Sequence, residues 1–405
     1  MKITAVETIL NPNWSNFLWV RIETDSGIVG LGETFRHVRP IETYLHTQTA
    51  EYLLGKDPRQ VNRHAYALRH TGGNRFSGYP TRSVEIRANS AVDLALWDLL
   101  GKYHNCSVTD LIGGAVRDSI PIYNTCAGPG YNWAGGQALN QSAARGDRAD
   151  NVVSDDLFLQ NNDPGELARS LLAEGIRMMK IWPFDEFASK TNGQYISDAD
   201  LQTGLSKIAA IREAVGGEME IMIEYHGFWK PAAAERILNA VDELNPFWHE
   251  DIIDSSHIDN LAHLRSISRS AFAGSENHGS SVWMRDALNQ RAIDYAHFDM
   301  GWVGGFSEAL TVSQLCAAHD VMVAPHDCTG PVVWCANLSL ALAMSNALVL
   351  ESVRAYYKGA YGQLVNTLPT IENGQALPLS GVGFGVELSE SLLNDPATVV
   401  TRSVL

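Results

Sequence analysis

The chain has 405 residues, of which 45% are hydrophobic and 19% are charged, and this composition is typical of a soluble globular protein with a large core. No apolar run reaches the roughly 18 residues that a membrane span needs, and a net charge of −16 disfavours nucleic acid and anionic membranes as partners. The five cysteines share no CxxC spacing and the N-terminus lacks a signal-peptide core, so we expect free thiols and a cytoplasmic location.

The first third of the chain is predicted to form its own α+β domain. Residues 1–35 alternate apolar and polar positions between turn signals, which predicts a meander of antiparallel strands. Residues 40–105 favour helices, and the clearest helix is predicted over 90–105. Its apolar residues fall on one face: Ala91, Leu94, Ala95 and Leu99. Strands followed by helices indicate a separate domain, here residues 1–117.

From about residue 118 the chain alternates short apolar runs with helical stretches. Eight runs predict strands, at 120–126, 175–182, 221–226, 247–251, 272–277, 295–300, 321–327 and 347–353. This alternation predicts a β/α barrel over residues 118–364, with its functional residues where the strands end. The segment 127–163 is long for a loop and predicts a lid or an insertion. The tail, 365–405, loses the alternation, and we expect it to pack on the first domain.

Three acidic residues follow successive predicted strands at equal spacing. Glu224, Glu250 and Glu276 are separated by intervals of 26 residues, which is about the length of one strand, one helix and two loops. We therefore expect three carboxylates at one rim of the barrel, where they would repel each other without a cation between them. Ligation by oxygen alone suits Mg²⁺. Asp251 remains an alternative to Glu250 as a ligand.

Two further residues continue this series. Asp299 lies 23 residues after Glu276, and His326 lies 27 residues after Asp299. An aspartate that bonds one imidazole nitrogen orients the ring and raises its basicity, which predicts His326 as a general base. Lys180 lies near the end of the predicted strand 175–182, where its ammonium group is suited to bind a substrate carboxylate as an electrophile.

Three more residues at the same rim have open roles. Trp182 lies two residues after Lys180 and points to the same side, where it either stacks on the substrate or walls it in. His226 lies two residues after Glu224, and it serves either as a general acid or in packing. Glu351, at the end of the eighth strand, either bonds a substrate oxygen or is structural.

The first domain is expected to contribute to substrate binding. The loop near Asn13–Phe17, and Asn16 within it, is placed to close over the barrel mouth. Arg36, Arg75 and Arg82 are candidates for binding a second substrate carboxylate, with Arg75 preferred, although loop arginines are more often solvated.

These motifs resemble the enolase superfamily in its mandelate racemase-like branch, and within it the acid-sugar dehydratases of the galactonate and gluconate type. The resemblance covers nearly the whole chain. Its motifs are ALWDLLGK (95–102), LIGGAVRDSIPIY (111–123), GIRMMK (175–180), IEYHG (223–227), FDMGWVGGFSEAL (298–310) and APHDCTGP (324–331). It implies a modified TIM barrel, (β/α)7β, with an α+β capping domain formed by the N-terminal region and the C-terminal tail.

The resemblance also implies a Mg²⁺-dependent dehydratase that converts a small sugar carboxylate, an aldonate or aldarate, to a 2-keto-3-deoxy acid. Homo-oligomers, either dimers or octamers, are common in this family. Racemases of this branch carry Lys-x-Lys, whereas this chain has Lys180 and Trp182, which disfavours simple racemisation. A cycloisomerase or an epimerase remains an alternative. A binding protein that lost its chemistry and a hydrolase are weaker alternatives.

Overall fold

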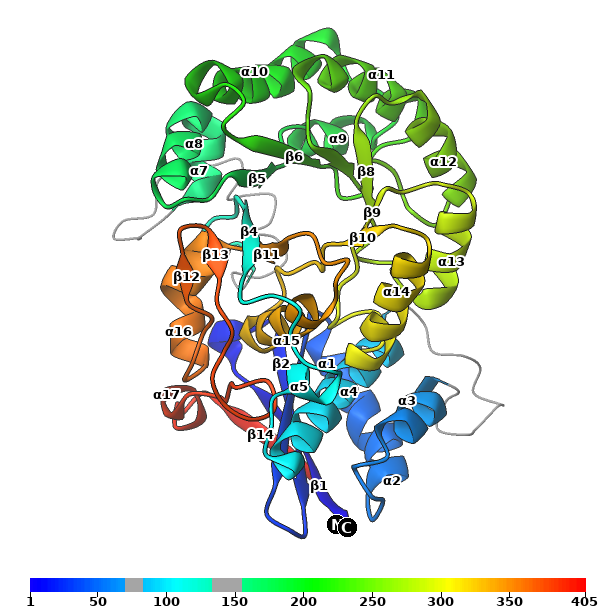
Figure 1. The fold of residues 1–405 in the computed structure, drawn as a ribbon, viewed down its shortest axis with the longest axis vertical. Helices are drawn as coiled ribbons and strands as arrows, with labels where there is room; N and C mark the ends of the chain where they lie inside the picture. The colour runs from blue at the N-terminus through cyan, green and yellow to red at the C-terminus, as the bar shows by residue number, and fades with distance from the viewer. Residues whose placement is uncertain (70–82, 133–154) are drawn as a thin grey trace.

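The structure, a computed structural model, describes residues 1–69, 83–132 and 155–405. Figure 1 shows a ring of strands and outer helices beside a smaller sheet-and-helix part, which holds both chain termini. Arg75, Arg82 and most of the segment predicted as a lid or insertion lie outside the described residues. No helix in the described part of the chain combines the length and the apolar character that a membrane crossing requires.

The smaller part is built on a four-stranded antiparallel sheet with strand order β14-β1-β2-β3. Its strands are β1 (Ile3–Leu10), β2 (Phe17–Thr24), β3 (Val29–Phe35) and β14 (Val399–Val404). The last strand of the chain therefore pairs with the first, and the tail packs on the N-terminal part. The domain boundaries after residues 117 and 364 stay a prediction.

The helices of this cap are α1 (Val38–Tyr44), η2 (Leu45–Thr49), α2 (Ala50–Leu53), α3 (Val61–Arg69), α4 (Val84–His104) and α5 (Val108–Leu111), with the short turn η1 (Pro12–Trp14) between β1 and β2. Helix α4 packs closely on β3 because Gly30 and Gly32 lack side chains, and a Cβ at either glycine would collide with a carbonyl oxygen of α4.

Helix α4 differs from the predicted helix in two respects. It begins at Val84, six residues earlier than predicted. The prediction of a single apolar face was wrong, because Ala91, Ala95 and Leu99 pack in the cap core whereas Leu94 packs in the barrel core. Helix α4 lies between the cap and the barrel, and it buries side chains against each of them.

All eight predicted barrel strands are present. They are β4 (Ile120–Thr125), β5 (Met178–Ile181), β6 (Glu220–Glu224), β7 (Trp248–Glu250), β8 (Ala271–Gly274), β9 (Tyr295–Ala296), β10 (Met322–Val323) and β11 (Leu350–Ser352). Neighbouring strands pair in parallel from β4 to β10, β11 pairs with β4, and a bridge between Val323 and Ala347 closes the ring. The interior is filled by side chains from six strand regions: Tyr123, Met222, Trp248, Ala273, Ala324 and Val349.

The outer helices follow the strands in the order expected of a β/α barrel. They are α7 (Asp156–Asn162), α8 (Pro164–Ala173), α9 (Asp185–Thr191), α10 (Asp198–Val215), α11 (Pro231–Val241), η5 (Asp242–Leu244), α12 (Ile258–Ile267), α13 (Ser281–Asn289), α14 (Phe306–Ala318), α15 (Pro331–Ala343), η6 (Tyr356–Ala360) and α16 (Tyr361–Leu364). The hairpin β12 (Ile371–Glu372) and β13 (Gln375–Ala376) and helix α17 (Glu390–Leu393) lead back to the cap. The predicted fold is confirmed.

A buried carboxylate of the cap holds one barrel loop. Glu33, on β3, accepts hydrogen bonds at 3.0 Å from the backbone N–H groups of Val332 and Val333 at the start of α15, and one at 2.6 Å from Trp19 Nε1. Burial raises the pKa of Glu33 to about 8. The next residue, Thr34, donates to the carbonyl of Gly301 at 2.8 Å. The cap is thereby fixed to the two loops that follow β9 and β10.

We predict that Glu33→Ala lowers the free energy of unfolding by about 2–5 kcal/mol, because it leaves three buried N–H groups without an acceptor. Urea and thermal unfolding measure the change. The matched control is Glu51→Ala, because Glu51 is an exposed acid on α2 and its loss should cost less than about 0.5 kcal/mol. Equal effects of the two substitutions would contradict this role for Glu33.

Candidate active site

A pocket at the carboxyl ends of the barrel strands gathers most of the predicted site. Seven of the predicted residues line it: Arg36, Lys180, Trp182, Glu224, His226, Glu276 and His326. The cap contributes Phe35 and Arg36, and the chain after β4 contributes Tyr131 and Asn132. The pocket therefore lies between the barrel and the cap.

The predicted dyad is formed. His326 Nδ1 lies 2.6 Å from Asp299 Oδ2, and a backbone bridge holds the two residues side by side. The second oxygen of Asp299 accepts the backbone N–H of Gly301 at 2.7 Å, which fixes the carboxylate. His326 Nε2 lies 2.7 Å from Glu276 Oε2. Burial alone would lower the pKa of His326, but Glu276, Glu351 and Asp299 raise it well above its ordinary value.

Lys180 lies among the carboxylates. Its Nζ is 2.6 Å from Glu250 Oε1, 2.9 Å from Glu351 Oε1 and 3.5 Å from Glu224 Oε2, and all four side chains are buried. Burial and the neighbouring Glu250 raise the pKa of Glu224 well above its ordinary value. Burial also acts to raise the pKa of Glu250, but His297 and Lys180 beside it lower that pKa well below its ordinary value. The lysine is thus the counter-charge of this cluster.

The three acids predicted as metal ligands do not occupy equivalent positions relative to their strands. Glu224 and Glu250 end neighbouring strands and are paired in the sheet register. Glu276 lies two residues beyond β8, in the wall of the pocket. Asp251, the alternative ligand, instead accepts hydrogen bonds from Ser255 and Ser275. Carboxylate oxygens are the ligand type that a hard divalent cation prefers, so the chemistry of the three acids suits Mg²⁺. The ligand atoms that the described residues gather within 4.8 Å of one another belong to a different set, so these three acids stay predicted ligands.

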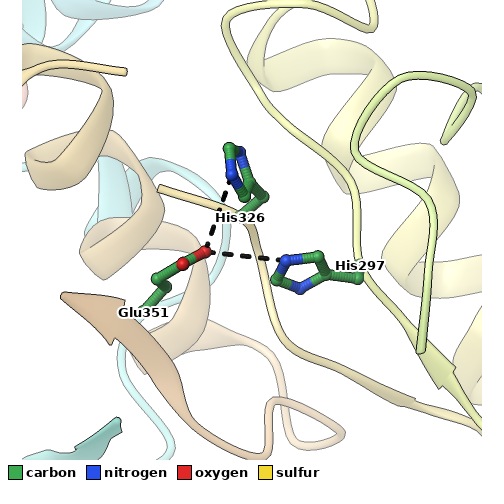
Figure 2. Close-up of side chains that lie close together, drawn as sticks. All are labelled: His297, His326 and Glu351. Atoms are coloured by element: carbon green, nitrogen blue, oxygen red, sulfur yellow. Dashed lines mark ion pairs between the residues drawn. The ribbon is translucent and has the colours of Figure 1, made fainter. Parts of the chain in front are cut away.

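A second group of possible ligands lies beside this set. Ligand atoms of His297, His326 and Glu351 all lie within 4.8 Å of one another. Figure 2 shows both imidazoles turned toward the Glu351 carboxylate, with Nε2–Oε2 distances of 3.6 Å to His297 and 4.0 Å to His326. Two imidazoles and one carboxylate suit a softer metal such as Zn²⁺ better than Mg²⁺.

His297 was missed by sequence reasoning. It is fully buried, its Nδ1 lies 2.5 Å from the carbonyl of Ala324, and its Nε2 lies 3.0 Å from Glu250 Oε1. It precedes Asp299 by two residues in the same strand region. Side chains at this spacing in a strand point to the same side, and this could have identified His297 as a candidate. The imidazole of His297 and the ammonium group of Lys180 therefore lie beside the same oxygen of Glu250.

Asp185 was also missed. Its Oδ2 lies 2.5 Å from His226 Nδ1, and it begins α9, which follows β5. His226 has a left-handed backbone conformation with φ of 50°, and its N–H donates to Glu224 Oε1 at 2.6 Å. The ring of Trp182 packs edge-on against the His226 ring at 5.9 Å. An aspartate at a helix start gives no signal that separates it from an ordinary capping residue.

Two predicted substrate contacts do not line the pocket. Glu351 is fully buried behind Lys180, accepts the N–H of Asp327 at 2.8 Å and accepts the hydroxyl of Thr125. Its place fits the structural alternative. Asn16 donates to the carbonyl of Asn132 at 2.5 Å, so it supports a residue of the pocket wall from outside. Arg75 lies outside the described residues.

We predict that Lys180→Met lowers the free energy of unfolding by about 3–5 kcal/mol in metal-free buffer at pH 8, because it leaves buried carboxylates without their cation. The pKa values of Glu250 and Glu351 are lowered in the folded protein, so the stability they contribute is present above their unfolded value of 4.5 and is lost as the pH falls. The difference between the two proteins should therefore shrink toward acidic pH.

Urea unfolding at several pH values tests this expectation. The matched control is Lys190→Met, because Lys190 pairs with Asp200 at 2.7 Å but is 55% exposed. A Lys180→Met protein as stable as this control would contradict the assigned charge balance.

Comparisons with known proteins identify the family of the chain. Residues 4–113 match the family described as mandelate racemase / muconate lactonizing enzyme, N-terminal domain, and residues 164–392 match the family described as enolase C-terminal domain-like. A crystal structure of an enolase of the mandelate racemase subgroup from Agrobacterium tumefaciens is 38% identical, with a TM-score of 0.87, and the match covers 100% of this chain and 99% of that chain.

An enolase protein from the environmental genome sequencing of the Sargasso Sea is 36% identical over 100% of this chain and 99% of that chain, with a TM-score of 0.87. The mandelate racemase/muconate lactonizing enzyme from Jannaschia sp. CCS1 is 25% identical over 97% of both chains, with a TM-score of 0.81. Two family models and near-complete coverage show that the chain belongs to the enolase superfamily, in its mandelate racemase-like branch.

Proposed function

We propose that the protein is a Mg²⁺-dependent dehydratase of a sugar acid, an aldonate or an aldarate. It removes the proton α to the carboxylate and eliminates the 3-hydroxyl to give a 2-keto-3-deoxy acid. The observation that carries the proposal is the placement of His326, oriented by Asp299 at 2.6 Å, in one pocket with Lys180, two carboxylates (Glu224 and Glu276) and a second histidine, His226. The third carboxylate, Glu250, is buried beside this pocket, 2.6 Å from Lys180.

The residues that would hold Mg²⁺ are Glu224, Glu250 and Glu276. Their all-oxygen donor set supports this metal over the softer metals that the neighbouring histidines would favour. When bound, the ion supplies positive charge that stabilises the enediolate formed from the substrate carboxylate. The α-proton of a carboxylate is so weakly acidic that this charge and the ammonium group of Lys180 are both needed.

The reaction is derived from the side chains as follows. His326 takes the C2 proton at Nε2, while its Nδ1–H stays bonded to Asp299. The electron pair of the broken C2–H bond first forms a C1=C2 double bond, with the added negative charge on the two carboxylate oxygens of the enediolate. This pair then forms the C2=C3 double bond as the carboxylate is restored and the C3–O bond breaks. His226 donates a proton to the departing hydroxyl, which leaves as water. The resulting enol then tautomerises to the 2-keto acid in solution.

One observation favours a second candidate, an epimerase or cycloisomerase that acts through the same enediolate. His226 follows the third barrel strand and His326 follows the seventh, so the two imidazoles approach the pocket from opposite sides of an eight-stranded barrel. Two bases on opposite faces are what proton return with inversion requires. This reaction forms no keto acid, which separates it from dehydration.

A screen tests the proposal. Purified protein with Mg²⁺ is incubated with a panel of C5 and C6 sugar monoacids and diacids, and 2-keto acid is detected with semicarbazide. The same panel is run in D₂O to detect exchange of the α-proton. Keto acid is the expected result. Exchange without keto acid would move the assignment to an epimerase or cycloisomerase, and the absence of both would contradict the proposed chemistry.

We predict that His326→Asn lowers kcat by at least about 10³-fold, because it removes the general base while leaving the carboxylates in place. Mg²⁺ affinity, measured by calorimetry, should change little. His319→Asn is the control, because His319 is an exposed histidine at the end of α14. Activity retained in His326→Asn would refute the assignment of the base.

We also predict that chelation abolishes activity and that added Mg²⁺ restores it. Glu224→Gln, Glu250→Gln or Glu276→Gln should each weaken Mg²⁺ binding at least about tenfold, because each removes one anionic ligand. Glu218→Gln, at an exposed position before β6, is the control. Unchanged Mg²⁺ affinity in all three ligand variants would place the metal elsewhere.

A further inference from the structure

The histidines of two Asp–His pairs line the pocket, and only one of these pairs was expected. Asp299 and His326 follow the sixth and seventh strands of the barrel, whereas Asp185 and His226 follow the second and third. In both pairs the aspartate comes from the earlier strand and contacts Nδ1 of the histidine, at 2.6 Å and 2.5 Å. The two pairs are separated by four strands, which is half of the ring.

The position of Asp185 is fixed by packing. Phe184, the preceding residue, is fully buried and its ring stacks on Tyr225 at 5.9 Å with an interplanar angle of 11°. Tyr225 lies between Glu224 and His226 in the sequence. Gly204 of α10 makes this packing possible, because a Cβ there would collide with the Phe184 ring. The two loops are therefore joined by one aromatic pair and one Asp–His pair in consecutive positions.

This arrangement leaves one nitrogen of His226 for chemistry. Nδ1 is engaged by Asp185, and the ring lies between Trp182 at 5.9 Å and Phe228 at 5.6 Å. His226 lines this pocket together with His326, and it also lines a neighbouring hollow beside Asp254. Its Nε2 is the nitrogen that Asp185 leaves unengaged. An imidazole held at Nδ1 by a carboxylate can deliver a proton through Nε2 in a fixed direction.

Resting on the proposed function, we infer that Asp185 is a positioning residue that aims His226 at the leaving 3-hydroxyl. Asp299 and His326 break the C2–H bond, and Asp185 and His226 assist the break of the C3–O bond by giving the hydroxyl the proton it needs to leave as water. The two halves of the reaction therefore belong to separate Asp–His pairs. Removing the Asp185 carboxylate should slow the loss of the 3-hydroxyl and leave the removal of the C2 proton largely intact.

The test separates the two halves in the Mg²⁺-loaded enzyme. The probes are the acid of the panel that gives most keto acid and its analogue with fluorine in place of the 3-hydroxyl, because fluoride leaves without a proton. In Asp185→Asn, kcat for dehydration should fall about 100-fold with KM within about threefold. Exchange of the C2 proton in D₂O and fluoride release should both stay within about threefold of the wild type.

Two variants complete the design. Glu186→Gln removes the neighbouring acid, which pairs with Lys207 at 3.1 Å on the surface, and should leave all rates within about twofold. Asp185→Glu keeps the carboxylate and should restore part of the dehydration rate. A parallel loss of dehydration, exchange and fluoride release in Asp185→Asn would show a merely structural role and overturn the inference. Unchanged dehydration would overturn it equally.

A measurement without substrate tests the hydrogen bond between Asp185 and His226 separately from the proposed reaction. In ¹⁵N-histidine-labelled protein, the Nδ1 signal of His226, assigned with His226→Asn, should report a strong hydrogen bond that is lost in Asp185→Asn. Absence of that bond in the wild type would overturn the inference. A blank substrate panel with the bond present would instead refute the proposed function alone.

Discussion

The site depends on the burial of one lysine among carboxylates. Lys180 contacts Glu250 at 2.6 Å and Glu351 at 2.9 Å, and neither acid is accessible to solvent. Charges in such an environment are stable only when they are paired and hydrogen-bonded. The other groups around the cluster meet this need: His297 approaches Glu250, and the N–H of Asp327 binds Glu351. The rim of the barrel is thereby organised before a substrate arrives, which reduces the reorganisation that catalysis would otherwise require.

The cap contributes more than a cover for the barrel mouth. Glu33 accepts two N–H groups at the start of α15, and Thr34 binds the carbonyl of Gly301, so one strand of the cap holds the loops on which Asp299 and His326 lie. These two residues fall three positions beyond their short strands, where the sheet alone would not fix them. The cap strand supplies the missing constraint.

The sequence predicted the parts of the site that follow from the barrel period. Equal spacing placed Glu224, Glu250 and Glu276 on successive strands, because each βα unit has nearly the same length. Contacts that depend on loop paths could not be predicted this way. Asp185 reaches His226 only because Phe184 stacks on Tyr225, and Glu351 turns behind Lys180 and away from the pocket. The positions of these side chains are decided by tertiary packing, which the spacing of residues in the sequence does not reveal.

Locating the metal tests the account most directly, because two possible ligand sets lie near each other at this end of the barrel. Crystals of the protein soaked with Mn²⁺ in place of Mg²⁺ give an anomalous signal that marks the ion. The account predicts one peak bound by oxygens of Glu224, Glu250 and Glu276 at roughly 2.1 Å. A peak held by His297, His326 and Glu351 would contradict it, because His326 would then be a ligand and not the base.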